Sequence, residues 1–155
     1  IGQKSSSKYE RADSSNYDDI EHENEESDKE NEKNNTKDFS SYTGIVIDTR
    51  GLDVIPALYP KVFDNDGYLL YGAGMVDINS ENHSTIVAYS RSKKKALKME
   101  RVGENPLIIE AVSVVKGKDK KATDIVLKNK DADAFLEVDQ ANNIIQKKAV
   151  VFIIK

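Results

Sequence analysis

The sequence has 155 residues, of which 38% are hydrophobic and 32% are charged, with a formal net charge of −4 and no cysteine. That length suits one ordinary domain with a modest core, and the lack of cysteine excludes disulfides, thiol catalysis and cysteine-bound zinc. No stretch approaches the ~20 consecutive apolar residues of a membrane-spanning helix.

Residues 1–40 differ in composition from the rest of the chain. They contain twelve acidic and six basic residues, a net charge of −6; since the whole chain carries −4, residues 41–155 carry +2. After Ile1, Ile20 is almost the only aliphatic residue, so the segment buries too little apolar surface to offset a backbone ordering entropy of roughly 1–2 kcal/mol per residue. We predict a disordered acidic tail or linker; the alternative is an acidic arm that contacts a basic partner. The start at Ile1 indicates a processed product or a fragment of a longer chain.

A strand, a proline-containing crossing and a hairpin are expected next. Residues 42–50, YTGIVIDTR, are rich in β-branched residues and predict a strand. Pro56 and Pro60 lack backbone donors, so the chain there is expected to form a loop crossing or a sheet edge. Residues 61–72, KVFDNDGYLLYG, predict a β-hairpin with Gly67 in the turn, where a positive φ is needed.

The middle of the chain is expected to lead into a first helix. Residues 77–84, DINSENHS, predict a loop, and the following TIVAYS fits either a strand or the approach to a helix. In residues 91–103, RSKKKALKMERVG, good helix formers follow Ser90 or Ser92, either of which can cap the helix, and Gly103 can end it.

The last third is expected to supply three strands and a second helix. Residues 105–117, NPLIIEAVSVVKG, contain the longest apolar run and predict a central strand, which the polar turn KGKDKK joins to another strand at 122–128. Residues 129–148 have apolar side chains at helical spacing and predict a helix capped by Asn129 or Asp131. The chain ends in AVVFIIK, which is typical of a strand in a sheet interior.

This order of elements favours an α+β fold, because helices and strands do not alternate strictly. We predict a single domain over residues 41–155, with a mixed or mainly antiparallel sheet of about five to six strands and two helices. The disordered acidic tail, residues 1–40, would precede it.

Catalytic and metal-binding signatures are weak. Neither His22 nor His83 has a cysteine or a second histidine nearby, so no transition-metal site is expected. No serine lies in a nucleophile elbow, and the glycines of GYLLYGAG lack the spacing of a phosphate-binding loop. We predict a non-enzymatic protein without a cofactor.

Two further motifs have ordinary structural interpretations. DNDG at residues 64–67 resembles the start of a calcium loop, but the twelfth position holds Met75 instead of glutamate, which favours the hairpin. The basic run RSKKKALK is the one feature that suggests nucleic-acid binding, since a basic helix face can meet phosphate. Aromatic residues are not interleaved with it and the rest of the domain is near neutral, so we expect a solvated face and no nucleic-acid partner.

Asp48 and Arg50 form the most suggestive polar pair. They are two residues apart on the first predicted strand, so their side chains share one face. The pair can form a polar binding site, or a local salt bridge that anchors the turn at Gly51. Acid–base chemistry would need Asp48 to meet Asp53 or Asp64, and nothing in the sequence shows that convergence.

Several segments together resemble a known family. YTGIVIDTRGLDVIPALYPKVFDNDGYLLYG is followed in order by IVAYSRS, RVGENPLIIEAVSV, TDIVLKNKDA and AVVFII. The series covers nearly all of residues 42–155 and resembles the C-terminal part of bacterial envelope proteins related to the LPP-twenty lipoproteins, some of which are linked to flagellar assembly. The matching residues are Gly44, Asp48, Arg50, Gly51, Leu52, Pro56, Ala57, Pro60, Asp64, Gly67, Tyr71 and Gly72. The chain departs from the family pattern at Thr49 and Asp53, shows no lipobox cysteine, and has the acidic tail in place of the family's N-terminal half.

This resemblance implies a non-enzymatic scaffold or assembly domain of the bacterial cell envelope, located in the periplasm or at the outer membrane. Its partners would be envelope proteins or a second copy of the chain. The alternative function is a small-ligand or cell-wall-binding module that uses Asp48 and Arg50.

The expected contact surface consists of the edge at Pro56–Pro60 and the neighbouring tyrosines. Tyrosine favours interfaces because it combines apolar area with a hydrogen-bonding tip. The alternative is that these tyrosines simply cover the edge of the sheet. The candidate interaction residues are Asp48, Arg50, Gly51, Pro56, Tyr59, Pro60, Asp64, Gly67, Tyr68 and Tyr71.

Overall fold

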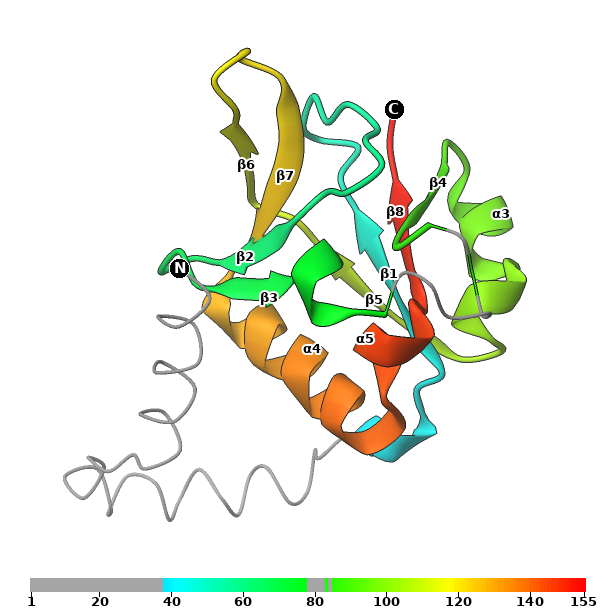
Figure 1. Ribbon diagram of the computed structural model, residues 1–155. Helices are drawn as coiled ribbons and strands as arrows, with labels where there is room; N and C mark the ends of the chain where they lie inside the picture. The colour runs from blue at the N-terminus through cyan, green and yellow to red at the C-terminus, as the bar shows by residue number, and fades with distance from the viewer. Residues whose placement is uncertain (1–37, 78–82, 84) are drawn as a thin grey trace, which may run out of the picture. The chain divides into compact units, whose positions relative to one another are not determined.

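The computed structural model describes residues 38–77, 83 and 85–155 (Figure 1). A boundary after Asp38 divides the chain into two units, and the second unit, Phe39–Lys155, contains all the helices and strands described here. The predicted acidic tail lies outside the described residues apart from its last three, and the predicted loop at 77–84 lies largely outside them as well. Among the described helices, none combines the length and hydrophobicity that a membrane crossing requires.

The fold is α+β, as predicted, and the described residues form eight strands in two four-stranded sheets. The parallel sheet has the order Ala88–Ser90 (β4), Val150–Ile153 (β8), Gly44–Asp48 (β1) and Pro106–Glu110 (β5). The mixed sheet has the order Leu69–Tyr71 (β3), Val62–Asp64 (β2), Ala122–Leu127 (β7) and Ser113–Lys116 (β6). The sequence predicted one mixed or mainly antiparallel sheet, whereas the structure has two sheets, one of them wholly parallel.

The helical elements are short except for one. The described residues form three α-helices, Lys93–Leu97 (α3), Asn129–Asn142 (α4) and Ile144–Lys147 (α5). Three 3-10 turns accompany them, at Phe39–Ser41 (η2), Ala73–Met75 (η3) and Glu100–Val102 (η4).

The two central strands of the parallel sheet are apolar on both faces. On one face, Ile45, Ile47, Val150 and Phe152 enter the larger core; on the other, Val46, Val151 and Ile153 pack with Ala96 of α3 and Val102 of η4. Because both faces are covered, the strands have continuous apolar sequences, and the predicted interior strand at the C-terminal end is confirmed as β8.

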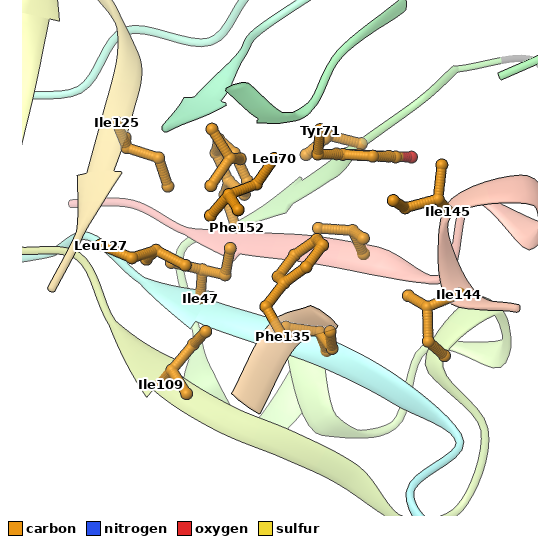
Figure 2. Packing of buried hydrophobic residues seen from close by; sticks show 14 of the residues in the cluster. Ile47, Leu70, Tyr71, Ile109, Ile125, Leu127, Phe135, Ile144, Ile145 and Phe152 are labelled. Atoms are coloured by element: carbon orange, nitrogen blue, oxygen red, sulfur yellow. The ribbon is translucent and has the colours of Figure 1, made fainter. Parts of the chain in front are cut away.

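The larger core lies between the parallel sheet, the mixed sheet and α4. Figure 2 shows Phe135 of α4 pointing toward Ile47 and Phe152, with Leu70 and Leu127 of the mixed sheet closing the same space. These side chains are fully buried, and each contributes about 1.5–3 kcal/mol by leaving water.

The predicted hairpin is confirmed as β2 and β3. Gly67 has a φ of +90°, and its amide donates to the carbonyl oxygen of Asp64 at 3.0 Å. The Asp64 carboxylate accepts hydrogen bonds from the amides of Asp66 and Tyr68, both at 2.9 Å. Asp64 and Gly67 therefore build the turn.

Residues 105–117 do not form a central strand, so that prediction is wrong. The run divides into β5 and β6, which are edge strands of different sheets. Between them, the amide of Ala111 still donates to Asp48 at the end of β1 (3.1 Å), whereas the amide of Val112 donates to Val126 of β7 (2.8 Å). The chain thus passes from one sheet to the other at this point.

The first predicted helix is shorter than expected. Only α3 is α-helical, and η4 follows it as a separate 3-10 turn. Ser92 caps α3, since its Oγ accepts from the amide of Lys95 at 3.2 Å, and Gly103, with a φ of +72°, ends η4. The preceding TIVAYS contains β4, so the strand alternative is correct.

The second predicted helix is interrupted. Asn143 adopts a left-handed conformation with a φ of +58° and separates α4 from α5. The N-cap of α4 is Lys128, which makes no side-chain cap hydrogen bond, so the predicted cap at Asn129 or Asp131 is wrong. The Asn129 side chain instead accepts from the amide of Asn65 at 3.0 Å and ties α4 to the hairpin turn.

Candidate functional site

The carboxyl ends of β1 and β5 frame a pocket of about 360 Å³. Asp48 ends β1 and lies opposite Glu110, the last residue of β5, in the parallel register. Ligands of open α/β sheets bind outside the carboxyl ends of parallel strands, so this is the expected position for a binding site. The lining residues are Asp48, Arg50, Gly51, Leu52, Glu110 and Ala111.

Asp48 and Arg50 form the predicted pair in a bidentate geometry. The Arg50 Nε donates to Oδ1 of Asp48 at 3.0 Å, and Nη2 donates to Oδ2 at 2.8 Å. The backbone amide of Arg50 also donates to Oδ1, at 3.0 Å. The carboxylate side chain is 14% exposed and the guanidinium side chain 44% exposed, so the positive end of the pair faces solvent.

The pair is ionised at neutral pH. Hydrogen bonding to the Arg50 side chain holds the pKa of Asp48 below its usual value, although partial burial opposes this effect. The same contact raises the pKa of Arg50. Both sequence interpretations are structurally possible, because the pair closes a local salt bridge and also lines the pocket.

Neither of the carboxylates considered as acid–base partners meets Asp48. Asp53 binds Lys155 instead, with Oδ1 2.7 Å from Nζ, and this contact lowers the pKa of Asp53. Asp64 lies in the hairpin turn. The second carboxylate of the pocket is Glu110, which sequence reasoning missed because only the non-local pairing of β5 with β1 brings it there.

The connection between β1 and β2 contains the two most exposed large apolar side chains of the described residues, Leu58 and Tyr59, together with exposed Ile55. Leu58 is 67% exposed, Tyr59 55% and Ile55 44%. Pro56 is exposed beside them, whereas Pro60 is buried. As predicted, these prolines lie in a loop crossing. Residues 55–60 form the apolar loop.

The apolar loop is firmly attached despite its exposure. Hydrogen bonds hold it at Ile55, at Ala57 and at Lys61, the residue directly after the loop. The three attachments are the amide of Ile55 to the Ala122 carbonyl (2.9 Å), the amide of Ala57 to Tyr89 Oη (3.0 Å) and the amide of Lys61 to Asp124 Oδ1 (2.9 Å). The Tyr89 ring packs edge-on against Phe152 with centroids 5.5 Å apart, so the middle attachment reaches the core.

The three tyrosines do not form one contact cluster. Tyr71 is fully buried, its Oη donates to the Ile86 carbonyl at 2.5 Å, and burial raises its pKa. Tyr71 therefore belongs to the core, which corrects its expected role in a contact surface. Tyr59 precedes β2 and half-buried Tyr68 precedes β3, so the two lie toward opposite ends of the antiparallel hairpin.

Gly51, another candidate residue, lines the pocket at the turn that follows β1. This turn is closed by a hydrogen bond from the amide of Leu52 to the Thr49 carbonyl at 2.9 Å. The structure thus separates the candidates into a pocket, a loop, a turn and one core residue. Leu58 and Ile55 were missed as contact residues, although Leu58 lies between the two prolines and Ile55 directly precedes the first of them.

Comparison with known proteins gives a family match over most of the domain. The model of the second domain of Treponema pallidum Tp0624 matches residues 44–155, which include both sheets, the pocket and the apolar loop. No curated protein matches the chain. The match agrees with the expected relation to a bacterial protein domain and says nothing of LPP-twenty lipoproteins or flagellar assembly. The chain therefore belongs to the family of the Treponema pallidum Tp0624 second domain.

Proposed function

We propose that this domain is a non-enzymatic assembly or scaffold module of the bacterial cell envelope that contacts a protein partner through the apolar loop. The observation that carries the proposal is that exposed apolar side chains lie on a loop whose backbone is held by hydrogen bonds. Leu58 and Tyr59 are more than half exposed, yet the loop that presents them is hydrogen-bonded at both ends and in its middle.

A fixed apolar loop suits protein recognition for energetic reasons. Single exposed apolar residues are common on protein surfaces and need no explanation. Here three occur within five residues, and Pro56 restricts the backbone between them. A loop that is already ordered loses less conformational entropy on binding, and a tyrosine beside a leucine supplies a typical interface anchor.

The envelope setting is part of the proposal. It is supported by the resemblance of residues 42–155 to envelope proteins related to the LPP-twenty lipoproteins, some of which are linked to flagellar assembly, and by the match to a bacterial family. On this proposal the domain works outside the cytoplasm, and its partner is an envelope protein or a second copy of the chain.

The test replaces the apolar tip and measures association. A photo-crosslinking residue at position 58 is expected to give a defined product with an envelope protein or a second copy, and Tyr59→Ser is expected to abolish it. The matched control places the crosslinker at position 108, because Ile108 is 41% exposed on the edge of the parallel sheet. Equal products from both positions, or none from either alongside a monomeric mass in solution, would contradict the proposal.

A second candidate function is the binding of a small ligand or cell-wall fragment in the pocket. It is favoured by the position of Asp48, Arg50 and Glu110 around about 360 Å³ at the carboxyl ends of parallel strands. A thermal-shift screen with sugars, peptidoglycan fragments and anions is expected to show a shift that Arg50→Ala removes. Lys155→Ala, which breaks an exposed ion pair outside the pocket, should leave that shift intact. The absence of any shift would exclude this function.

A further inference from the structure

The free edge of the mixed sheet is a second exposed feature, separate from the apolar loop. β6 is the last strand of that sheet, and within the described residues only β7 pairs with it. Val114 points toward the core, whereas Ser113, Val115 and Lys116 are exposed. A strand edge offers backbone N–H and C=O groups to an additional strand.

The turn next to this edge is ordered and strongly basic. The amide of Gly117 donates to the Lys121 carbonyl at 3.0 Å, and the amide of Lys121 donates to Asp119 Oδ1 at 3.0 Å. Residues 116–121, KGKDKK, carry four lysines and one aspartate, a net charge of +3, and all six are exposed. Figure 1 shows this turn projecting beyond the body of the two sheets.

We propose that β6 and its basic turn bind an extended acidic segment of a partner protein by strand addition. The backbone of β6 would pair with the segment, as in other proteins that add a peptide strand to a sheet edge. Val115, 39% exposed, would contact apolar residues at alternate positions of the segment. Acidic residues at the end beside the turn would meet its lysines.

The same charges disfavour pairing between the β6 edges of two copies. Two β6 edges brought together would place two sets of turn lysines in one interface, and like charges across an interface are unfavourable. Lysine on an edge strand is a common means of preventing such self-pairing. An acidic strand meets the same lysines favourably, so the edge selects it over a copy of itself.

The probe is a fluorescein-labelled peptide of alternating valine and glutamate, and its binding to the full chain is measured by fluorescence anisotropy. Lys118→Glu with Lys121→Glu is expected to weaken binding by about tenfold or more, because attraction at two sites becomes repulsion. The matched control is Lys93→Glu with Lys94→Glu, which reverses two exposed lysines on α3 and should leave binding unchanged. Leu58→Ser with Tyr59→Ser should also bind as well as the unaltered chain, which separates this proposal from the function of the apolar loop.

A second peptide tests strand pairing apart from charge. Replacing its valines with proline keeps the acidic charge and removes backbone donors, so its binding should be lost. In amide hydrogen exchange, the valine–glutamate peptide is expected to protect residues 113–116. The proposal is overturned if the peptide does not bind, if the proline peptide binds equally well, or if the α3 variant loses as much affinity as the turn variant.

Discussion

Among single residues, Asp48 has the clearest consequence for titration behaviour. Its carboxylate binds Arg50 through both oxygens, and this lowers its pKa from the usual 3.8. Stability from such a group is present above the unfolded pKa and is lost as the pH falls through the lowered folded pKa. We therefore expect Arg50→Ala to raise the pKa of Asp48, because the burial that opposes ionisation remains after the guanidinium is removed.

The measurement is an NMR titration of the aspartate carboxyl carbons in both proteins. Asp53 is the internal control, since its low pKa arises from Lys155 and should not respond to Arg50→Ala. An unchanged Asp48 pKa would show that the bidentate contact is not maintained in solution. The same outcome would remove the fixed polar wall from the proposed ligand pocket.

At the scale of elements, β1 and η4 approach unusually closely at Gly44. A Cβ atom at this position would lie 2.5 Å from the Cα and 2.7 Å from the Cβ of Val102. Since the obstruction includes backbone, side-chain rotation cannot relieve it. Gly44→Ala is expected to destabilise the domain by about 1–3 kcal/mol or more, as overpacking of a core does.

Urea unfolding checks this expectation, with Gly51→Ala as the control. Gly51 has nothing within 4 Å of the corresponding Cβ position, so its substitution should change the free energy of unfolding by less than about 0.5 kcal/mol. Equal stability of the two variants would show that η4 can move away from β1 at little cost.

The elements also show which features the sequence could predict. The hairpin at Gly67 and the cap at Ser92 depend on residues a few positions apart, and both are found. The run at 105–117 looked like one buried strand because its apolar residues serve two sheets in succession. The run divides into two strands, and Glu110 lies opposite Asp48, because of strand pairing between distant segments. No local sequence pattern encodes such pairing. The burial of Tyr71 also involves distant residues, since its ring packs with Phe135 and its Oη donates to the Ile86 carbonyl.

At the scale of the whole domain, Tyr89 connects the apolar loop to the core through one ring contact and one hydrogen bond. Its ring packs against Phe152 of the central strand, and its Oη accepts the hydrogen bond from the Ala57 amide. A smaller side chain at position 152 should therefore affect the loop as well as the core. We expect Phe152→Leu to lower the free energy of unfolding by less than the roughly 3–5 kcal/mol of a Phe→Ala change and to speed exchange of the Ala57 amide.

Phe135→Leu provides a matched cavity elsewhere in the same core. Phe135 is equally buried but its ring partner is Tyr71, with centroids 6.1 Å apart. If the linkage is local, Phe135→Leu should lower the free energy of unfolding about as much as Phe152→Leu does. Exchange of the Ala57 amide should then speed up only as far as this loss of global stability requires. Crosslinking from position 58 should then weaken in Phe152→Leu and persist in Phe135→Leu. If both variants affect the loop equally, its attachment depends on overall stability, and Tyr89 does not transmit a specific effect from β8.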